Sequence, residues 1–281
     1  SGLVCWTVGG VVTRYPSLNN PTKVSVGGGM CAIDSVGVHC LSGDVLQQVS
    51  TPSLINPTQV SVGFDHRCAL DDSGVVCWES NGYGQATVPF LADPHDVSEV
   101  SAGGLVTCVI EGSSVICWGS NNDGQTDIPS LSNPKHVSVG GAHVCALDDI
   151  GVVCWGGNGA AQTDVPSLSN PVWVSAGNDH TCALDDTGVV CWGQNHSGQS
   201  TVPDNLSFLG TTNESNPNLN SISLAAGGGS SFALKPDGTW LAWGANYEGK
   251  LGVGSPPDSY YYPSEPATVV DGLGNQLLDV K

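Results

Sequence analysis

Cysteine is the residue type in this sequence with the clearest chemistry, because ten of the eleven cysteines fall into pairs at one constant spacing. Eight residues separate the two members of each pair, and the pair flanks a tight turn of the Asp-Asp-x-Gly type. A hairpin with this register places two cysteines opposite each other on antiparallel strands, where their Cα separation suits a disulfide. We therefore predict five local disulfides: Cys31–Cys40, Cys68–Cys77, Cys108–Cys117, Cys145–Cys154 and Cys182–Cys191.

Each predicted bridge closes a loop of ten residues, which is worth roughly 2 to 3 kcal/mol in the chain-entropy description of disulfides. Zinc coordination is the alternative use of paired cysteines, but a tetrahedral site needs four converging ligands. These pairs instead recur at intervals of 37 to 40 residues. Because five bridges persist only in an oxidising compartment, we expect an extracellular, cell-surface or periplasmic protein.

Histidine and aspartate recur beside these cysteines and are the next candidates for metal binding. One imidazole per repeat cannot converge with the others on one ion, so we interpret the histidines as structural side chains that satisfy buried backbone groups. An Asp in a turn caps its own backbone, and a calcium site needs six or more oxygens. We therefore expect no metal and no cofactor. The residues concerned are His66, His143, His180, Asp71, Asp72, Asp148, Asp149, Asp185 and Asp186.

These residues belong to a repeat of about 37 residues that fills nearly the whole chain. Short β-branched runs separated by Gly, Asn and Asp indicate four short strands in each copy. An aromatic residue follows the second cysteine, and we expect it to pack between neighbouring copies. The positions are Trp6, Trp78, Trp118, Trp155, Trp192 and Trp243, with Leu41 as a substitute. Seven positions predict an all-β, seven-bladed β-propeller that forms a single domain over residues 1–281.

The two ends of the sequence complement each other. The first residues read like the second half of a repeat, and residues 263–281 read like the first strand of a further repeat. We therefore expect a ring closed by both termini, which removes exposed sheet edges. The second strand of this closing blade is missing, so we expect either a fragment of a longer chain or a blade without that strand. We place the partner of Cys5 in the same missing stretch.

Acidic residues dominate the charge of the chain. There are 26 Asp and Glu against 7 Lys and Arg, for a formal net charge of -19. Such a surface repels DNA and acidic membranes, and no apolar run approaches the roughly 18 residues of a membrane-spanning helix. We therefore expect no nucleic-acid partner, no membrane insertion and a monomeric protein.

Two motifs of the repeat, V-S-x-G-x-x-H-x-C-A-L and G-V-V-C-W-G-x-N-x-x-G-Q, resemble the repeats of the regulator of chromosome condensation family. This resemblance implies a propeller and three classes of function. Nucleotide exchange on chromatin conflicts with the acidic charge and the disulfides. Secreted β-lactamase-inhibiting propellers share the mid-blade start and a Gln-Thr-x-x-Pro link, which residues 125–129 and 162–166 reproduce. Many secreted or surface-bound bacterial propellers of this type resemble binding modules.

Candidate contact residues follow from the strand order. In a meander the first and third turns of each copy emerge on one face, where Phe64, Tyr83 and Tyr247 are the aromatic side chains that we expect. The inhibitory propellers are rich in aromatics at the first turn, whereas this chain has only Phe64 there. Two irregular segments, 204–220 and 255–266, interrupt the repeat, and the second contains Tyr260, Tyr261 and Tyr262. Tyrosine clusters suit protein or glycan recognition, although packing on the rim is an equal alternative.

Catalytic motifs are missing from the sequence. It contains no G-x-S-x-G elbow, no H-E-x-x-H and no phosphate loop. Propeller hydrolases and lyases assemble sites from scattered residues, so a non-repeated polar cluster in the central channel would favour catalysis. We expect no enzyme, but a non-catalytic extracellular scaffold that binds a protein or polysaccharide through its loops. The alternatives are a secreted inhibitor of an enzyme such as a β-lactamase or protease, and a propeller hydrolase or lyase.

Overall fold

The computed structural model describes residues 3–6, 12–15, 18–42, 48–206, 222–246, 251 and 267–268. Within these residues the regular secondary structure is almost entirely β-strand, and the two helices are single 3₁₀ turns at Pro94–Asp96 and Asp204–Leu206. Neither is long or apolar enough to cross a membrane. The all-β fold class predicted from the sequence is confirmed.

The strands form antiparallel sheets in chain order. Two sheets have four strands: β3 (Lys23–Val26), β4 (Gly29–Ile33), β5 (Val38–Ser42) and β6 (Gln48–Val49), and then β19 (Ser223–Gly227), β20 (Ser230–Leu234), β21 (Trp240–Gly244) and β22 (Ala267–Thr268). Four sheets have three strands: β7 (Gln59–Val62), β8 (His66–Asp71) and β9 (Gly74–Glu79); β10 (Val97–Gly103), β11 (Val106–Glu111) and β12 (Ser114–Gly119); β13 (His136–Val139), β14 (His143–Leu147) and β15 (Val152–Gly156); β16 (Trp173–Ala176), β17 (His180–Asp185) and β18 (Gly188–Gly193). The pair β1 (Leu3–Trp6) and β2 (Val12–Tyr15) completes the set.

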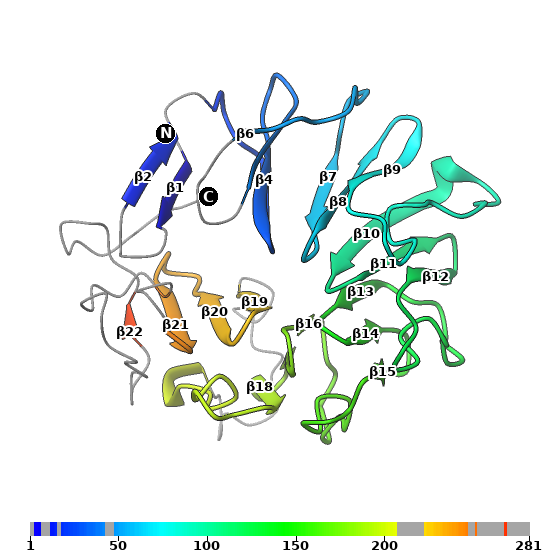
Figure 1. Ribbon diagram of the computed structural model, residues 1–281. Helices are drawn as coiled ribbons and strands as arrows, with labels where there is room; N and C mark the ends of the chain where they lie inside the picture. The colour runs from blue at the N-terminus through cyan, green and yellow to red at the C-terminus, as the bar shows by residue number, and fades with distance from the viewer. Residues whose placement is uncertain are drawn as a thin grey trace.

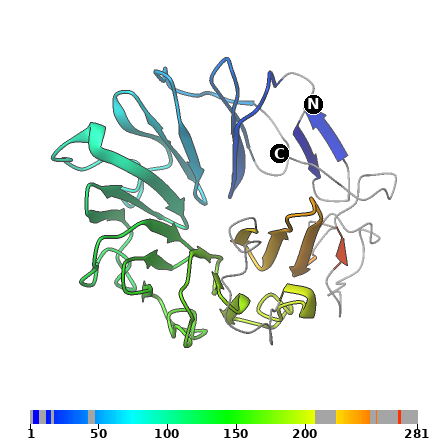
Figure 2. The same ribbon diagram turned by 180° about the vertical axis from the view of Figure 1, so that it is seen from behind.

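The sheets follow one another around a common centre, as Figure 1 and the reverse view in Figure 2 show. The first strands of neighbouring sheets contact one another, so they form the inner wall. Six sheets have three or four strands. The count of seven blades and the closure by both termini stay predictions.

The prediction of four strands in every copy is wrong for three of the sheets, β7–β9, β10–β12 and β13–β15, whose following links are fully described; sheet β16–β18 also has three strands among the described residues, which leave out 207–221. After β9 the chain leaves the sheet, and its Val88 and Leu91 pack against Val109 and Trp118 of the next sheet. Because sheets diverge away from a common centre, the link fills the widening gap between them with apolar side chains. It therefore contributes to the core without pairing as a strand.

All five predicted disulfides are present, and their Cα atoms lie 4.1 Å apart. The register explains them, because the two cysteines of each pair are directly opposite, as Cys182 is to Cys191. Cys182 and Cys191 belong to a hydrophobic cluster that also contains Leu224 and Trp243 of the next sheet. The bridges therefore staple each central hairpin at the place where the next sheet packs on it.

Serine hydroxyls protect the edges of the inner strands. The Ser138 hydroxyl accepts a hydrogen bond of 3.0 Å from the Ala176 backbone N–H of the next sheet. The same contact recurs from Val62 to Ser25, Ala102 to Ser61, Val139 to Ser101 and Ala226 to Ser175. Unpaired edge N–H groups are thereby satisfied, which blocks pairing with another chain. The inner wall is a rigid frame for the turns at its ends.

Candidate functional site

In five of the sheets the first and third turns lie on one face, as the strand order predicts. One backbone hydrogen bond joins the two turns in each of these sheets, for example from the Ser80 N–H to the Asp65 carbonyl at 3.2 Å. The equivalents run from Ser120 to Leu105, Gly157 to Ala142, Gln194 to Asp179 and Ala245 to Gly229. We call this face, made of residues 63–65, 104–105, 141–142, 178–179 and 228–229 with 80–84, 120–124, 157–161 and 194–198, the turn face.

The first turns are also bonded to one another across the sheets. The Phe64 N–H donates to the Gly104 carbonyl at 3.1 Å, and the Asn178 N–H donates to the Gly228 carbonyl at 3.0 Å. A Cβ atom on Gly104 would collide with the Gly141 carbonyl, so this close approach requires glycine. The inner rim of the turn face is therefore held by its own backbone.

Phe64 and Tyr83 are the predicted contact residues that the structure brings together. They occupy the two turns of the β7–β9 sheet that the Ser80–Asp65 bond joins, and 68% of Phe64 and 53% of Tyr83 are exposed. The Tyr83 N–H donates to the side-chain oxygen of the fully buried Gln85 at 2.9 Å. Both rings thus stand on a fixed backbone. The other candidates, Tyr247 and Tyr260–Tyr262, lie outside the described residues, as do segment 255–266 and most of 204–220.

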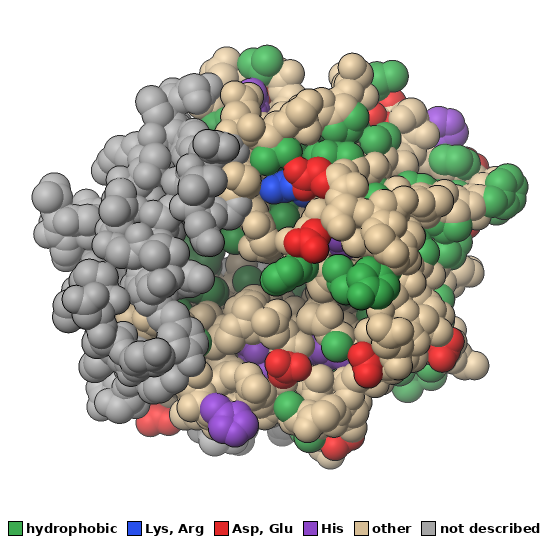
Figure 3. Space-filling model, in the orientation of Figure 1, with side chains coloured by type: hydrophobic (Ala, Val, Ile, Leu, Met, Phe, Trp, Pro, Cys, Tyr) green, Lys and Arg blue, Asp and Glu red, His purple; other side chains and the backbone are tan. Residues whose placement is uncertain are grey.

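Acidic side chains accompany the two rings. Asp65, beside Phe64, and Asp179, in the equivalent turn of the β16–β18 sheet, belong to the turn face, and Asp65 is exposed. The face seen in Figure 3 carries several separate Asp and Glu side chains and only a small area of Lys and Arg. The local charge therefore has the same sign as the net charge.

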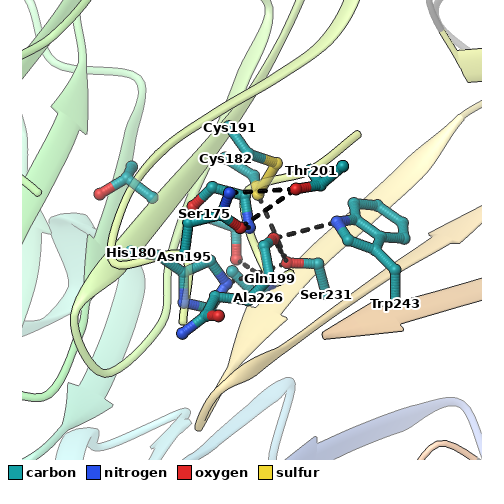
Figure 4. Close-up of a disulfide and its surroundings, with 12 residues drawn as sticks. Ser175, His180, Cys182, Cys191, Asn195, Gln199, Thr201, Ala226, Ser231 and Trp243 are labelled. Carbon is teal, nitrogen blue, oxygen red and sulfur yellow. Dashed lines mark hydrogen bonds between the residues drawn. A yellow bond between two sulfur atoms is a disulfide. The ribbon is translucent and has the colours of Figure 1, made fainter. Parts of the chain in front are cut away.

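The recurring histidines are structural, and the Nε2 atom of each is bonded to a side-chain hydroxyl of the next sheet. His180 Nε2 lies 2.9 Å from the Ser231 hydroxyl of the next sheet, and that hydroxyl donates to the Gln199 carbonyl at 3.0 Å. Trp243 Nε1 donates to the same carbonyl at 2.9 Å, beside the Cys182–Cys191 bridge (Figure 4). The same set recurs as His66, Thr107, Gln85 and Trp118, and as His143, Thr181, Gln162 and Trp192.

The tautomer of these histidines follows from counting hydrogens. The Ser231 hydroxyl has one hydrogen and gives it to Gln199, so His180 Nε2 must carry the hydrogen of the other bond. Its Nδ1 is buried without a hydrogen-bond partner among the described residues. Burial lowers the pKa of His66, His143 and His180 to about 4. These imidazoles are therefore neutral near pH 7, and they lie on separate sheets where no ion could bind them together.

The first Asp of each pair in the second turns caps its own backbone on the opposite face, as predicted, whereas the second Asp bonds to an Asn side chain. Asp148 accepts from the N–H groups of Ile150 and Gly151 with one oxygen and from the Ser132 N–H with the other, at 2.8 to 3.0 Å. Burial by itself would raise the pKa of Asp148, but these three donors hold it below its usual value. No group of three or more His, Cys, Asp or Glu in the described part of the chain is arranged to hold a metal ion.

A polar cluster that the sequence analysis missed lies along the inner wall. His136 Nδ1 lies 2.7 Å from Glu99 Oε1, His136 Nε2 lies 2.9 Å from the Val174 carbonyl, and the imidazole stacks on Trp173 with ring centroids 3.9 Å apart. Each first strand carries a different residue at this level, so only a comparison of the repeat copies could have indicated it. Both imidazole nitrogens are occupied by hydrogen bonds, so His136 binds neighbouring sheets together.

A second departure from the repeat lies beside the two exposed rings. Arg67 stands where other sheets have Thr107 or Thr181, and its buried guanidinium forms an ion pair with Glu79. Glu79 stands where Gly119 and its equivalents stand, with a positive φ of 76°. The signal in the sequence that could have indicated this departure is Glu79 itself, which replaces the glycine of the repeat.

Fold and site together define a disulfide-stapled β-propeller whose turns form a fixed face. Residues 174–199 match the regulator of chromosome condensation (RCC1) repeat. The resemblance stated from the sequence motifs is thereby confirmed. No curated protein sequence matches the chain significantly.

Solved structures confirm the fold. The chain is similar to human WBSCR16, at 20% identity and a TM-score of 0.71 over 92% of this chain and 84% of that one. It is similar to yeast RCC1 (Prp20), solved bound to Kap60, at 15% identity and a TM-score of 0.75 over 97% and 84% of the two chains. It is also similar to the ectodomain of the Physcomitrella patens receptor kinase CR4, at 21% identity and a TM-score of 0.63 over 86% and 72%.

Proposed function

We propose that this protein is a non-catalytic, extracellular scaffold that binds a protein partner through its turn face. The observation that carries the proposal is the exposure of Phe64 and Tyr83 on joined turns of a single sheet. Large rings on a fixed backbone bury much area at low entropy cost, and such residues supply most of the binding energy in protein interfaces. RCC1-type propellers bind proteins in solved complexes, since yeast RCC1 was solved with Kap60.

The extracellular location is supported by the five disulfides. The same fold occurs in the ectodomains of two plant receptor kinases, from Physcomitrella patens and Arabidopsis thaliana. We propose that the protein is a monomer. We also propose that it has no nucleic-acid partner, because the net charge of -19 repels polyanions. A non-catalytic role is supported by His136, whose two nitrogens are engaged in bonds to its neighbours.

We also propose that the propeller has seven blades and is closed by both termini. The sheet β1–β2 brings the number of sheets to seven. Val24 and Val26 of β3 are 45% and 72% exposed, whereas Val137 and Val174, the equivalents of Val24, and Val139, the equivalent of Val26, are buried in clusters with the preceding sheet. An apolar face of β3 is thus available for a closing blade.

The test is affinity capture from extracellular and envelope proteins with three oxidised baits: wild type, F64A/Y83A and F90A. Phe90 is the matched control, because it is 92% exposed but lies in the link after the third turn. We expect a saturable protein partner whose affinity falls at least about tenfold for each ring removed, and no loss with F90A. Equal binding by wild type and F64A/Y83A would refute the turn face as the contact surface. Capture of a secreted enzyme that the bait inhibits would select the inhibitor alternative.

A further inference from the structure

The junction between sheets β3–β6 and β7–β9 departs from the recurring contact of a histidine with a threonine or serine, and its residues Arg67 and Glu79 follow and precede the turns of Phe64 and Tyr83 in the chain. Where sheet β3–β6 meets sheet β7–β9, Gly29 occupies the position of the recurring histidine, Arg67 the position of the threonine, and Glu79 the position of the glycine. The three residues depend on one another. A Cβ atom on Gly29 would collide with the Arg67 guanidinium, so the small residue makes room for the large one.

The Arg67 guanidinium links two sheets. It is only 5% exposed, Nη2 donates to the Leu41 carbonyl of β5 at 3.1 Å, and Nη1 pairs with Glu79. Among the Lys and Arg side chains whose burial the structure describes, Arg67 is the buried one. Glu79, at the end of β9, is therefore tied through Arg67 to the neighbouring sheet.

Stability alone does not account for this arrangement. Glu79 has a φ of +76°, a conformation that costs free energy in any residue with a Cβ, and the equivalents Gly119, Gly156 and Gly193 have φ values of 93° to 112° without that cost. A buried ion pair is also weak grounds for stability, because desolvation offsets much of the attraction. The other junctions have the less costly solution, so the departure points to a role other than folding.

The position of Glu79 suggests that role. It is the residue at which the chain leaves β9 for the Tyr83 turn, and it pairs in register with His66, at which the chain enters β8 from the Phe64 turn. The bond from Ser80 to Asp65 follows immediately. An exit residue that is not glycine, anchored by its side chain, allows the turn fewer orientations than a free glycine does.

We propose that Arg67 and Glu79 are positioning residues that hold the Tyr83 turn in register with the Phe64 turn, so that both rings are presented in one preformed arrangement. The proposal rests on the proposed binding function. Its direct consequence is measurable without a partner, because the bond from the Ser80 amide to Asp65 follows Glu79 directly and should open more often when the Arg67–Glu79 pair is removed.

The first test is hydrogen exchange on wild type and R67T/E79G. The double variant installs the residues of the next junction, Thr107 and Gly119, and avoids a single change that would leave a buried charge unpaired. We expect the Ser80 amide to exchange at least about tenfold faster, while the equivalent Ser120 amide, bonded to Leu105 at 2.9 Å, keeps its rate. Unchanged exchange at Ser80 in a folded variant would overturn the proposal.

The second test uses a peptide selected on wild type from a random displayed library, with affinity that depends on Phe64 and Tyr83. We expect R67T/E79G to bind it at least about tenfold more weakly, mainly through slower association, at an unchanged melting temperature. If R67T/E79G binds the peptide as tightly and as fast as wild type does, the positioning role is wrong. If no selected peptide depends on Phe64 and Tyr83, the proposed binding function fails, whereas the exchange result stands.

Discussion

At the residue scale, the junctions between sheets show that side chains change in matched pairs. His143 and Thr181 form one polar pair, His180 and Ser231 form another, and at the junction between β10–β12 and β13–β15 the two positions are Val106 and Val144. A buried donor without an acceptor costs more than two apolar side chains in contact. The chain therefore has either both polar partners or neither at these junctions.

The buried histidines should make the protein sensitive to acid. Burial lowers the pKa of His66, His143 and His180 from 6.5 to about 4 in the folded state, so the unfolded chain takes up protons first as the pH falls. Burial of the neutral histidines therefore does not lower the free energy of unfolding above pH 6.5. Between pH 6.5 and 4 the free energy of unfolding falls by on the order of 3 kcal/mol for each histidine.

Chemical unfolding at pH 7.5 and pH 4.5 checks this expectation. H143V/T181V, which copies the Val106–Val144 junction, should lose less stability on acidification than wild type does. T181V alone leaves the His143 Nε2–H buried without an acceptor and should lower the free energy of unfolding by roughly 1 to 3 kcal/mol at pH 7.5. A double variant as acid-sensitive as wild type would show that other groups control the transition.

At the element scale, the second turns connect each central hairpin to the segment that precedes its sheet. Asp148 receives three backbone N–H groups, one of them from Ser132, sixteen residues earlier in the chain. The carboxylate of its neighbour Asp149 is exposed and bonds to the side chains of Asn133 and Lys135. Two adjacent residues of one type therefore have different structural roles.

D148A should lower the free energy of unfolding by about 2 to 3 kcal/mol, because it leaves three backbone donors without their acceptor. D149A, the matched control, should change it less, since water replaces the contacts of an exposed carboxylate. Urea titration of both variants at pH 7.5 measures the difference. Equal losses would mean that the cap holds the turn no more firmly than the exposed pair does.

At the scale of the whole molecule, like charge opposes compactness. The chain carries a formal charge of -19, and the Lys and Arg residues that form ion pairs within the described ranges are Arg67, Lys135 and Lys235. Unpaired carboxylates repel one another more strongly in the folded state than in the expanded chain. Salt that screens the repulsion between these carboxylates is therefore expected to raise the free energy of unfolding.

The melting temperature at pH 7.5 should rise when sodium chloride increases from about 10 to 200 mM, because salt screens this repulsion over a Debye length of about 10 Å. Calorimetry of the oxidised protein in the two buffers makes the comparison. A melting temperature that falls with salt would indicate that the few ion pairs, among them Arg67–Glu79, outweigh the general repulsion.

The spacing of residues within one repeat was enough to predict the disulfides and the packing of the tryptophans. Cys182 and Cys191 are nine residues apart in one hairpin, so the register of two adjacent strands is enough to predict their bond. The recurrence of Trp192 and its equivalents likewise predicts packing between copies, because the same neighbour follows at the same interval. Both predictions concern positions that the repeat holds constant.

Only the tertiary structure decided the contacts that vary between copies. His136 meets Glu99 at 37 residues' separation and Val174 at 38, and Arg67 meets Leu41 at 26. No period in the sequence says which side chain faces which across two packed sheets, because that depends on the space its neighbours leave, such as the missing Cβ of Gly29. For the same reason the sequence could name Phe64 and Tyr83 as aromatic, but their exposure on two joined turns is a property of the folded chain.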